Sequence, residues 1–97
     1  MNEYERLHRM AQINKERYPS GTRILLLQIG DDPRPIDPNT RATVRVVDDI
    51  GTLHCDFDNG RKLGIVPGED SFRKLTEEEL TEEQEMTESE DFGMKMQ

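Results

Sequence analysis

The segment TLHCDFDNGRKLGIV, residues 52–66, decides the fold of this 97-residue chain. Apolar and polar residues alternate on both sides of Asn59-Gly60, a dipeptide typical of the tight turn between two antiparallel strands. The pattern predicts a β-hairpin with strands at 52–57 and 62–66. One face of this hairpin is expected to point into a core and carries Leu53, Cys55, Phe57, Leu63 and Ile65.

Two further strands are expected upstream of the hairpin. Residues 41–48 alternate between two faces, and Gly51 in the turn that follows can take a positive φ. Residues 22–29 carry apolar side chains on both faces, which is typical of a strand covered from both sides, and we expect an N-terminal helix to be the second cover. The intervening stretch has three prolines within six residues, so it is expected to form an irregular loop.

The chain after the hairpin is expected to turn at 67–70 and to close the barrel with a short helical turn at Ser71-Phe72. The predicted core then has ten inward side chains, which is enough for a small barrel. They are Ile24, Leu26, Val44, Val46, Leu53, Cys55, Phe57, Leu63, Ile65 and Phe72.

Residues 2–17 are predicted to form a short amphipathic helix. Asn2 and Glu5 have the three-residue spacing of an N-terminal cap pair, which satisfies free amide donors at a helix start. Because a short helix is marginal in isolation, we expect it to pack on the barrel or on a partner. Its narrow stripe, at spacings of three and four, consists of Tyr4, Leu7, Met10, Ala11 and Asn14.

Charge divides the chain into two parts. Residues 1–75 hold twelve basic and twelve acidic residues, whereas residues 76–97 hold nine acidic residues and one lysine, so the tail carries the whole net charge of −8. A body without net positive charge is not typical of a general nucleic-acid binder, which uses clustered Lys and Arg to displace phosphate counterions.

The acidic tail admits two interpretations. It could form a helix over about 77–88, begun by a capping box at Thr76 with Glu79 or at Thr81 with Gln84. Alternatively, its acids repel one another and bury almost nothing, which is typical of a disordered or frayed segment. We expect the second of these.

Several classes of protein are disfavoured by composition. Cys55 is the single cysteine and lies in an alternating strand, so it is expected to be a buried apolar residue rather than a disulfide partner or nucleophile. Residues 1–10 lack the apolar core of a signal peptide. The longest apolar run, residues 24–27, is far too short to cross a bilayer. We therefore expect a cytoplasmic location and no membrane partner.

No catalytic constellation is recognisable in the sequence. His8 and His54 lie in different segments, and neither neighbours a nucleophile. Four aspartates near predicted turns could gather around a divalent cation, but their spacing fits no known ligand loop, and such acids more often accept hydrogen bonds from backbone amides. These four are Asp48, Asp49, Asp56 and Asp58. We expect no enzyme activity, no cofactor and no metal site.

Five separated motifs occur in order within residues 18–75: Tyr18-Pro-Ser-Gly-Thr-Arg, Asp31-Asp-Pro, Val47-Asp-Asp-Ile-Gly-Thr, Asp58-Asn-Gly and Pro67-Gly-Glu-Asp-Ser-Phe. In these motifs the chain resembles a small family of uncharacterised domains of phages and other bacterial mobile elements. The resemblance implies an SH3-like barrel and a mobile-element origin, and it carries no assigned catalytic or binding residues.

The expected fold is therefore mainly β (α+β), a small SH3-like β-barrel of four to five strands with a short N-terminal helix and an acidic C-terminal tail. The expected division is a helix at 1–18, a barrel at 19–75 and a tail at 76–97.

Two functions of different classes fit these features. The first is a non-enzymatic phage or mobile-element accessory protein that inhibits a host defence nuclease in the bacterial cytoplasm, as anti-CRISPR proteins do. Its acidic surface would compete for a basic groove that normally holds nucleic acid. The contacts would come from the first helix and from the tail, where they are Glu77, Glu78, Glu79, Glu82, Glu83, Glu85, Glu88, Glu90, Asp91, Leu80, Met86 and Phe92.

The second function is a small nucleic-acid-binding regulator whose acidic tail autoinhibits the basic face of the barrel. Arg41, Arg45, Arg61 and Lys62 would then contact nucleic acid. Acids equal bases in the body, and the predicted outer face lacks aromatic residues on which bases stack, so a host protein is the expected partner ahead of nucleic acid. The alternative without a binding function is that the acidic tail only increases solubility and that the basic residues of the body only form salt bridges on its surface.

Overall fold

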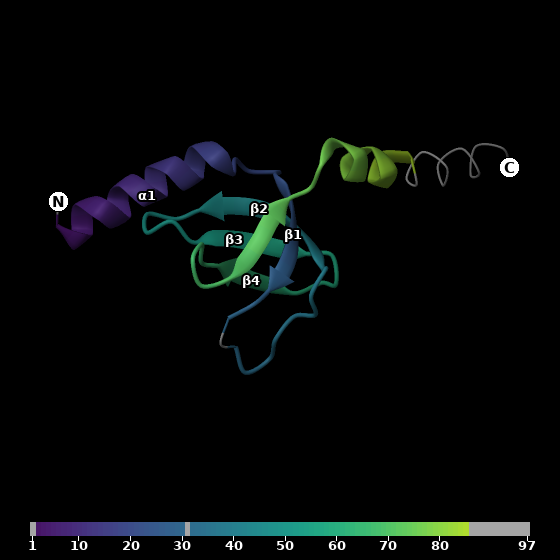
Figure 1. Cartoon of the computed structure of the whole chain (residues 1–97), viewed down its shortest axis with the longest axis horizontal. Coiled ribbons are helices and arrows are strands. Elements are labelled where there is room, and N and C mark those ends of the chain that lie inside the picture. The colour runs from purple at the N-terminus through teal and green to yellow at the C-terminus, as the bar shows by residue number, and fades with distance from the viewer. Residues whose placement is uncertain (1, 31, 86–97) are drawn as a thin grey trace, which may run out of the picture.

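The computed structural model describes residues 2–30 and 32–85 (Figure 1). A second helix, the C-terminal helix, begins at residue 77 and is described to residue 85. None of the described helices is both long and apolar enough to span a bilayer. The other elements are α1 (Glu3–Arg17), β1 (Arg23–Gln28), β2 (Arg41–Val47), β3 (Leu53–Phe57), β4 (Lys62–Ile65) and β5 (Ser71–Lys74).

The strands form one antiparallel sheet with the order β4-β3-β2-β1-β5. The sheet is open, with β4 and β5 at its edges, and β1 and β5 cross in front of the other strands (Figure 1). The predicted mainly β, α+β class with up to five strands is therefore confirmed. The hairpin of β3 and β4 is also confirmed, and Gly60 takes a φ of 91° in its turn.

The core lies between the two halves of the bent sheet. Ile24 and Leu26 from β1 are fully buried, as are Leu53 and Cys55 from β3 and Ile65 from β4. Of the ten predicted inward residues, nine belong to this core or pack against it. Sequence reasoning missed Ile36, Ala42 and Val47, which the core also includes.

The predicted inward position of Val46 is wrong. Val44 pairs with Cys55, but the register shifts before Val46, which pairs with His54. This irregularity inserts a residue into β2, and because side chains alternate along a strand, it exchanges the two faces. Val46 is 51% exposed, and Val47 is buried in its place.

The predicted helical turn at Ser71-Phe72 is also wrong, because these residues begin β5. Asp70 sets the path of the chain here. Its Oδ1 accepts a hydrogen bond from the Gly30 N–H at 2.6 Å, and its Oδ2 accepts one from the Val66 N–H at 2.8 Å. These bonds tie the turn to the end of β1, so the next residues pair with β1 as a strand.

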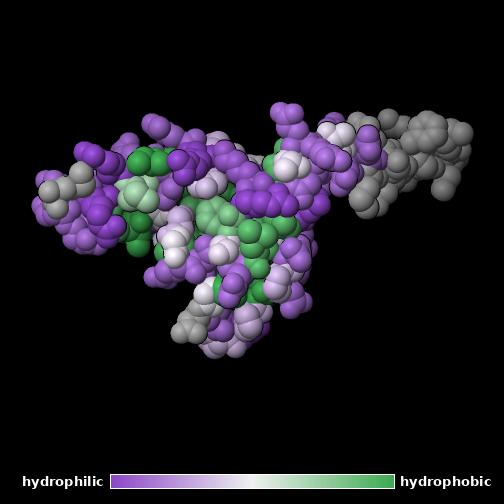
Figure 2. All heavy atoms as spheres, viewed as in Figure 1, coloured by the Kyte–Doolittle hydropathy of each residue, from purple (hydrophilic) through white to green (hydrophobic). Residues whose placement is uncertain are grey.

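Helix α1 begins as predicted, with the Asn2 side chain accepting a hydrogen bond from the Glu5 N–H at 2.8 Å. It packs on β2 and on the turn that follows β2, and not on β1, which it was expected to cover. Asn14 is buried there and donates to the carbonyl of Gly51 at 3.3 Å. Figure 2 shows hydrophobic residues exposed beside α1, whereas the C-terminal helix is mainly hydrophilic.

Candidate functional site

Three arginines lie together on the outer face of the sheet. Arg41 on β2 and Arg73 on β5 both pair with Leu25 on β1. The side chains of Arg41, Leu25 and Arg73 therefore form one row across the sheet. Arg23 is two residues before Leu25 and therefore points to the same face. Leu25 is only 7% exposed although it lies outside the main core, so this part of the outer face is covered. We call Arg23, Arg41 and Arg73 the arginine cluster.

Carboxylates hold Arg23 from two sides. Its Nη1 and Nη2 donate to Oδ1 and Oδ2 of Asp58 at 2.8 and 2.7 Å, and Nη1 also donates to Thr43 Oγ1 at 3.1 Å. Its Nε and Nη2 donate to Oε2 and Oε1 of Glu83 at 3.2 and 2.5 Å. The hydrogen bonds to Asp58 and Glu83 raise the pKa of Arg23, and they lower the pKa of both carboxyls. All three groups are therefore charged at neutral pH.

The C-terminal helix brings its carboxylates to all three arginines. Glu83 Oε1 also accepts a hydrogen bond from Arg41 Nη1 at 3.0 Å. Glu79 accepts from Nη1 and Nη2 of Arg73 at 2.7 and 3.0 Å, and its Oε2 lies 4.0 Å from Arg41 Nη2. The hydrogen bonds from Arg73, together with one from the Thr76 N–H, lower the pKa of Glu79 to about 2.

The local sequence of the helix places both carboxylates on one side. Thr76 and Glu79 form the predicted capping box, since the Glu79 N–H donates to Thr76 Oγ1 at 3.1 Å and the Thr76 N–H donates to Glu79 Oε1 at 2.9 Å. Glu83 is one turn further along the same face. The second predicted box, at Thr81, is wrong, because Thr81 lies inside the helix and its hydroxyl donates to the Glu77 carbonyl at 2.8 Å.

The site is balanced in formal charge. Asp58, Glu79 and Glu83 supply three negative charges against the three positive charges of the arginine cluster. The C-terminal helix contributes two of those negative charges. If this helix left the sheet, the arginine cluster and Asp58 together would carry a net charge of two positive units.

The predicted tail residues fall into three groups. Glu79 and Glu83 contact the sheet, as described above. The other acids of the helix and Leu80 are exposed to solvent; they are Glu77, Glu78, Glu82 and Glu85. The remaining predicted contacts lie outside the described residues, and these are Met86, Glu88, Glu90, Asp91 and Phe92.

Of the four basic residues predicted to contact nucleic acid, only Arg41 belongs to the arginine cluster. Lys62 is exposed on the edge strand β4, where it pairs with Asp56 of β3. Asp56 also separates Lys62 from Arg45, whose Nε lies 3.7 Å from Asp56 Oδ1. Arg61 Nη1 donates to the carbonyl of Arg34, in the loop between β1 and β2, at 2.6 Å.

Sequence reasoning did not single out Arg23 and Arg73 as site residues. Arg23 could have been found, because it alternates with Leu25 on the face of β1 that points away from the core. Arg73 could not be placed, because β5 was not expected to be a strand.

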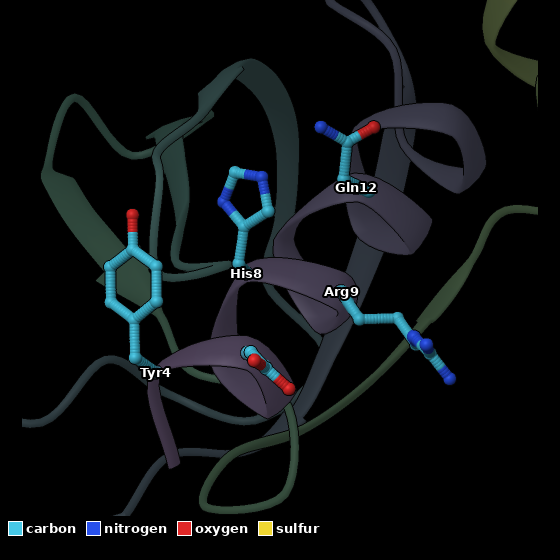
Figure 3. A pocket seen from close by; sticks show the side chains of 5 residues that line it. Tyr4, His8, Arg9 and Gln12 are labelled. Carbon is cyan, nitrogen blue, oxygen red and sulfur yellow. The ribbon is translucent and has the colours of Figure 1, made fainter. Parts of the chain in front are cut away.

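A second candidate surface lies on α1, where Tyr4, Glu5, His8, Arg9 and Gln12 line a shallow depression (Figure 3). The rings of Tyr4 and His8 come from successive turns and stack with 6.1 Å between their centroids. All five side chains belong to one helix, so a single element forms the depression. A ligand there would remain largely in water, and the arginine cluster is the better candidate.

The aspartates considered for a metal ion have other partners. Asp48 Oδ1 accepts hydrogen bonds from the N–H groups of Ile50 and Thr52, both at 3.0 Å, as expected for a turn residue. Its Oδ2 lies 2.8 Å from His54 Nε2. Within residues 2–30 and 32–85, no three His, Cys, Asp or Glu side chains gather in a way that could hold a metal ion.

The chain belongs to a family described as Domain of unknown function (DUF4314), whose model matches residues 6–75. This confirms the predicted membership of a family without an assigned function. The matched stretch includes all five strands and the arginine cluster, and it ends before the C-terminal helix. No curated protein and no solved structure matches the chain.

Proposed function

We propose that this protein is a small, non-enzymatic nucleic-acid-binding module whose acidic C-terminal helix occupies its own binding surface. The observation that carries the proposal is the contact of Glu79 and Glu83 with the arginine cluster. Carboxylates bind arginine through the same paired N–H donors that bind phosphate oxygens. The helix therefore stands where a phosphate backbone would bind, and it keeps the module closed until nucleic acid displaces it.

The contacts of Glu83 set the scale of this autoinhibition. The side chains of Glu83, Arg23 and Arg41 are between 20% and 29% exposed, so water screens their two ion pairs only partly. Such pairs contribute about 0.2–1 kcal/mol each. Because an affinity is reduced by the fraction of molecules in the binding-competent state, these two pairs alone would weaken nucleic-acid binding by a factor of roughly 2 to 30.

An SH3-like barrel is part of the same proposal. Five short antiparallel strands bend over one core, and the first strand pairs with the last, which supports this type. A small barrel of this kind offers a sheet surface for nucleic acid while its interior stays filled with side chains.

The second candidate is an accessory protein of a phage or mobile element that inhibits a host defence nuclease. One observation favours it: Glu78, Glu82 and Glu85 are exposed to solvent and give one flank of the helix an anionic surface. Such a face would compete for a basic groove in a nuclease. In this role the contacts of Glu79 and Glu83 hold the helix in position instead of masking a site.

The two candidates separate in one experiment. The variant E79Q/E83Q removes both carboxylates that touch the arginine cluster. Its matched control, E78Q/E82Q, removes the same number of charges at the same spacing from the exposed face of the same helix. Binding of a short fluorescein-labelled DNA duplex to each is measured by fluorescence anisotropy at low salt, and circular dichroism confirms that both variants fold.

The proposed module predicts that E79Q/E83Q binds the duplex roughly tenfold more tightly than the control does. Equal affinities of the two variants would refute autoinhibition through these contacts. If neither variant nor a chain truncated after Leu75 binds nucleic acid, the nucleic-acid proposal itself fails. The inhibitor candidate then predicts that E78Q/E82Q, and not E79Q/E83Q, has the greater loss of binding to a defence nuclease.

A further inference from the structure

We infer that the arginine cluster binds two successive phosphates of one strand of a nucleic-acid duplex and reads no bases. This inference rests on the proposed function and specifies its ligand. It starts from the carboxylates that occupy the cluster, because their positions record where the arginines can hold anionic oxygens.

The cluster offers two neighbouring anion positions with Arg41 between them, since its Nη1 donates to Glu83 and its Nη2 lies 4.0 Å from Glu79 Oε2. At the first, Arg23 and Arg41 converge on Glu83, whose Oε1 accepts from Arg23 Nη2 at 2.5 Å and from Arg41 Nη1 at 3.0 Å. At the second, Arg73 holds both oxygens of Glu79. Two donors on one oxygen and a paired fork on two oxygens are both geometries that phosphate accepts.

The distance between these positions suits a polyanion rather than a single phosphate. Glu79 and Glu83 are four residues apart on a helix, which corresponds to a rise of about 6 Å along its axis. Successive phosphates of one nucleic-acid strand have a comparable separation. One turn of the acidic helix therefore imitates two neighbouring phosphates.

The Asp58 carboxylate prepares the first position. It holds Nη1 and Nη2 of Arg23, which leaves Nε and the remaining hydrogen of Nη2 for the ligand. The guanidinium is thus oriented before the ligand arrives, at the cost of one unit of positive charge. We regard Asp58 as a positioning residue that favours a defined phosphate contact over strong general attraction.

Aromatic side chains do not line the cluster in the part of the chain that the structure describes. Phe57 is in the core, and Tyr18 and Phe72 pack against it. Tyr4 lies on α1, where it stacks on His8. Proteins that bind single strands stack bases on exposed aromatic rings, each worth a substantial part of their affinity. A cluster with only phosphate contacts is suited to a duplex, whose bases are already stacked and whose phosphates face outward.

The test uses E79Q/E83Q as the open form and adds R73Q or, as a matched control, K74Q. Both additions remove one positive charge from β5. Arg73 belongs to the cluster, whereas Lys74 pairs with Ile24 on the opposite face and lies 5.4 Å from the centre of the Tyr18 ring. Affinities for a mixed-sequence DNA duplex, for a second duplex of unrelated sequence and for the separate single strands are measured over a range of salt concentrations.

The inference predicts tighter binding of the duplex than of either strand and equal affinity for the two duplexes. It also predicts that R73Q reduces the slope of log K against log [salt] by about 0.9, the value for one phosphate contact on a duplex, while K74Q leaves it nearly unchanged. Tighter binding of single strands, a preference between the duplexes, or equal effects of R73Q and K74Q would overturn it. If the open form bound no nucleic acid at all, the proposed function would fail before this inference was reached.

Discussion

The substitution Gly51→Ala tests how α1 is held on the sheet. Gly51 has a φ of 90°, and a Cβ atom added there would lie 3.1 Å from Asn14 Nδ2 and 3.6 Å from the backbone of Ala11. Asn14 is the buried polar residue of α1, and its hydrogen bond to the Gly51 carbonyl is 3.3 Å long. The new methyl group would therefore press on the contact that joins the helix to the turn after β2.

The expected cost has two parts. A side chain at positive φ costs roughly 1–2 kcal/mol, and loss of the Asn14 hydrogen bond adds about 1 kcal/mol. Gly60→Ala is the matched control, because Gly60 has a φ of 91° and a Cβ atom there would meet nothing within 4 Å. Gly51→Ala should therefore lower the free energy of unfolding by about 1 kcal/mol more than Gly60→Ala does.

Urea unfolding followed by circular dichroism measures both variants. The midpoints should shift in the order wild type, Gly60→Ala, Gly51→Ala, with similar m values. Asn14→Ala should cost less in the Gly51→Ala background than in the wild type, because it removes the atom that the methyl group meets. Equal midpoints for the two alanine variants would show that Asn14 of α1 does not contact position 51 as described. Strictly additive losses of unfolding free energy for Gly51→Ala and Asn14→Ala would show the same.

Three further predictions concern other contacts. Asp70→Ala leaves the N–H groups of Gly30 and Val66 without their acceptor and should lower the free energy of unfolding by about 1–3 kcal/mol, measured by urea titration; an unchanged midpoint would contradict this. Burial raises the pKa of the Cys55 thiol to about 12, so a disulfide reagent at pH 8 should label it only after unfolding, and rapid labelling of the folded protein would count against the buried position. Hydrogen bonds from Arg73 lower the pKa of the Glu79 carboxyl from its ordinary 4.5 to about 2. Its contribution to docking of the C-terminal helix is therefore complete above pH 4.5 and is lost as the pH falls towards 2; an NMR titration midpoint near 4.5 would show that the pair does not form.

The strands that were predicted well are those in which apolar and polar residues alternate without interruption over a short stretch of sequence. In β3 and β4, apolar residues recur at every second position and a turn signal joins the strands, so a short window of sequence contains the needed information. Val46 was placed on the wrong face because a single irregularity in β2 exchanges the inward and outward positions. No residue type in this stretch of sequence indicates that irregularity. The strand β5 was missed because only Phe72 of its four residues is apolar and its partner β1 lies far away in the sequence.

The arginine cluster could not be predicted in full, because it is assembled by long-range register. Arg23, Arg41 and Arg73 come from three strands, and only the pairing of Arg41 and Arg73 with Leu25 shows that they share a face with Arg23. The contact of the acidic tail with the sheet could not be predicted either. Its composition suggested self-repulsion, and the capping box at Thr76 predicted a helix, but neither indicated that two of its carboxylates would be neutralised by arginines of the sheet.

If the acidic helix imitates phosphates, the affinity of the wild-type protein for a duplex should depend less on salt than that of the open variant. When a duplex displaces the helix, each arginine exchanges a carboxylate for a phosphate. Cations released from the two phosphates are offset by cations taken up around Glu79 and Glu83 once these leave the sheet. In E79Q/E83Q no such uptake occurs, so its log K should fall with log [salt] more steeply than that of the wild type. The difference in slope should be smaller than the roughly 1.8 that two phosphates contribute, because two side-chain carboxylates take up fewer cations than a duplex releases. The advantage of the open variant should therefore shrink as salt increases. Parallel salt slopes for the two proteins would mean that the helix and the duplex do not compete for the same arginines, even if the open variant binds more tightly.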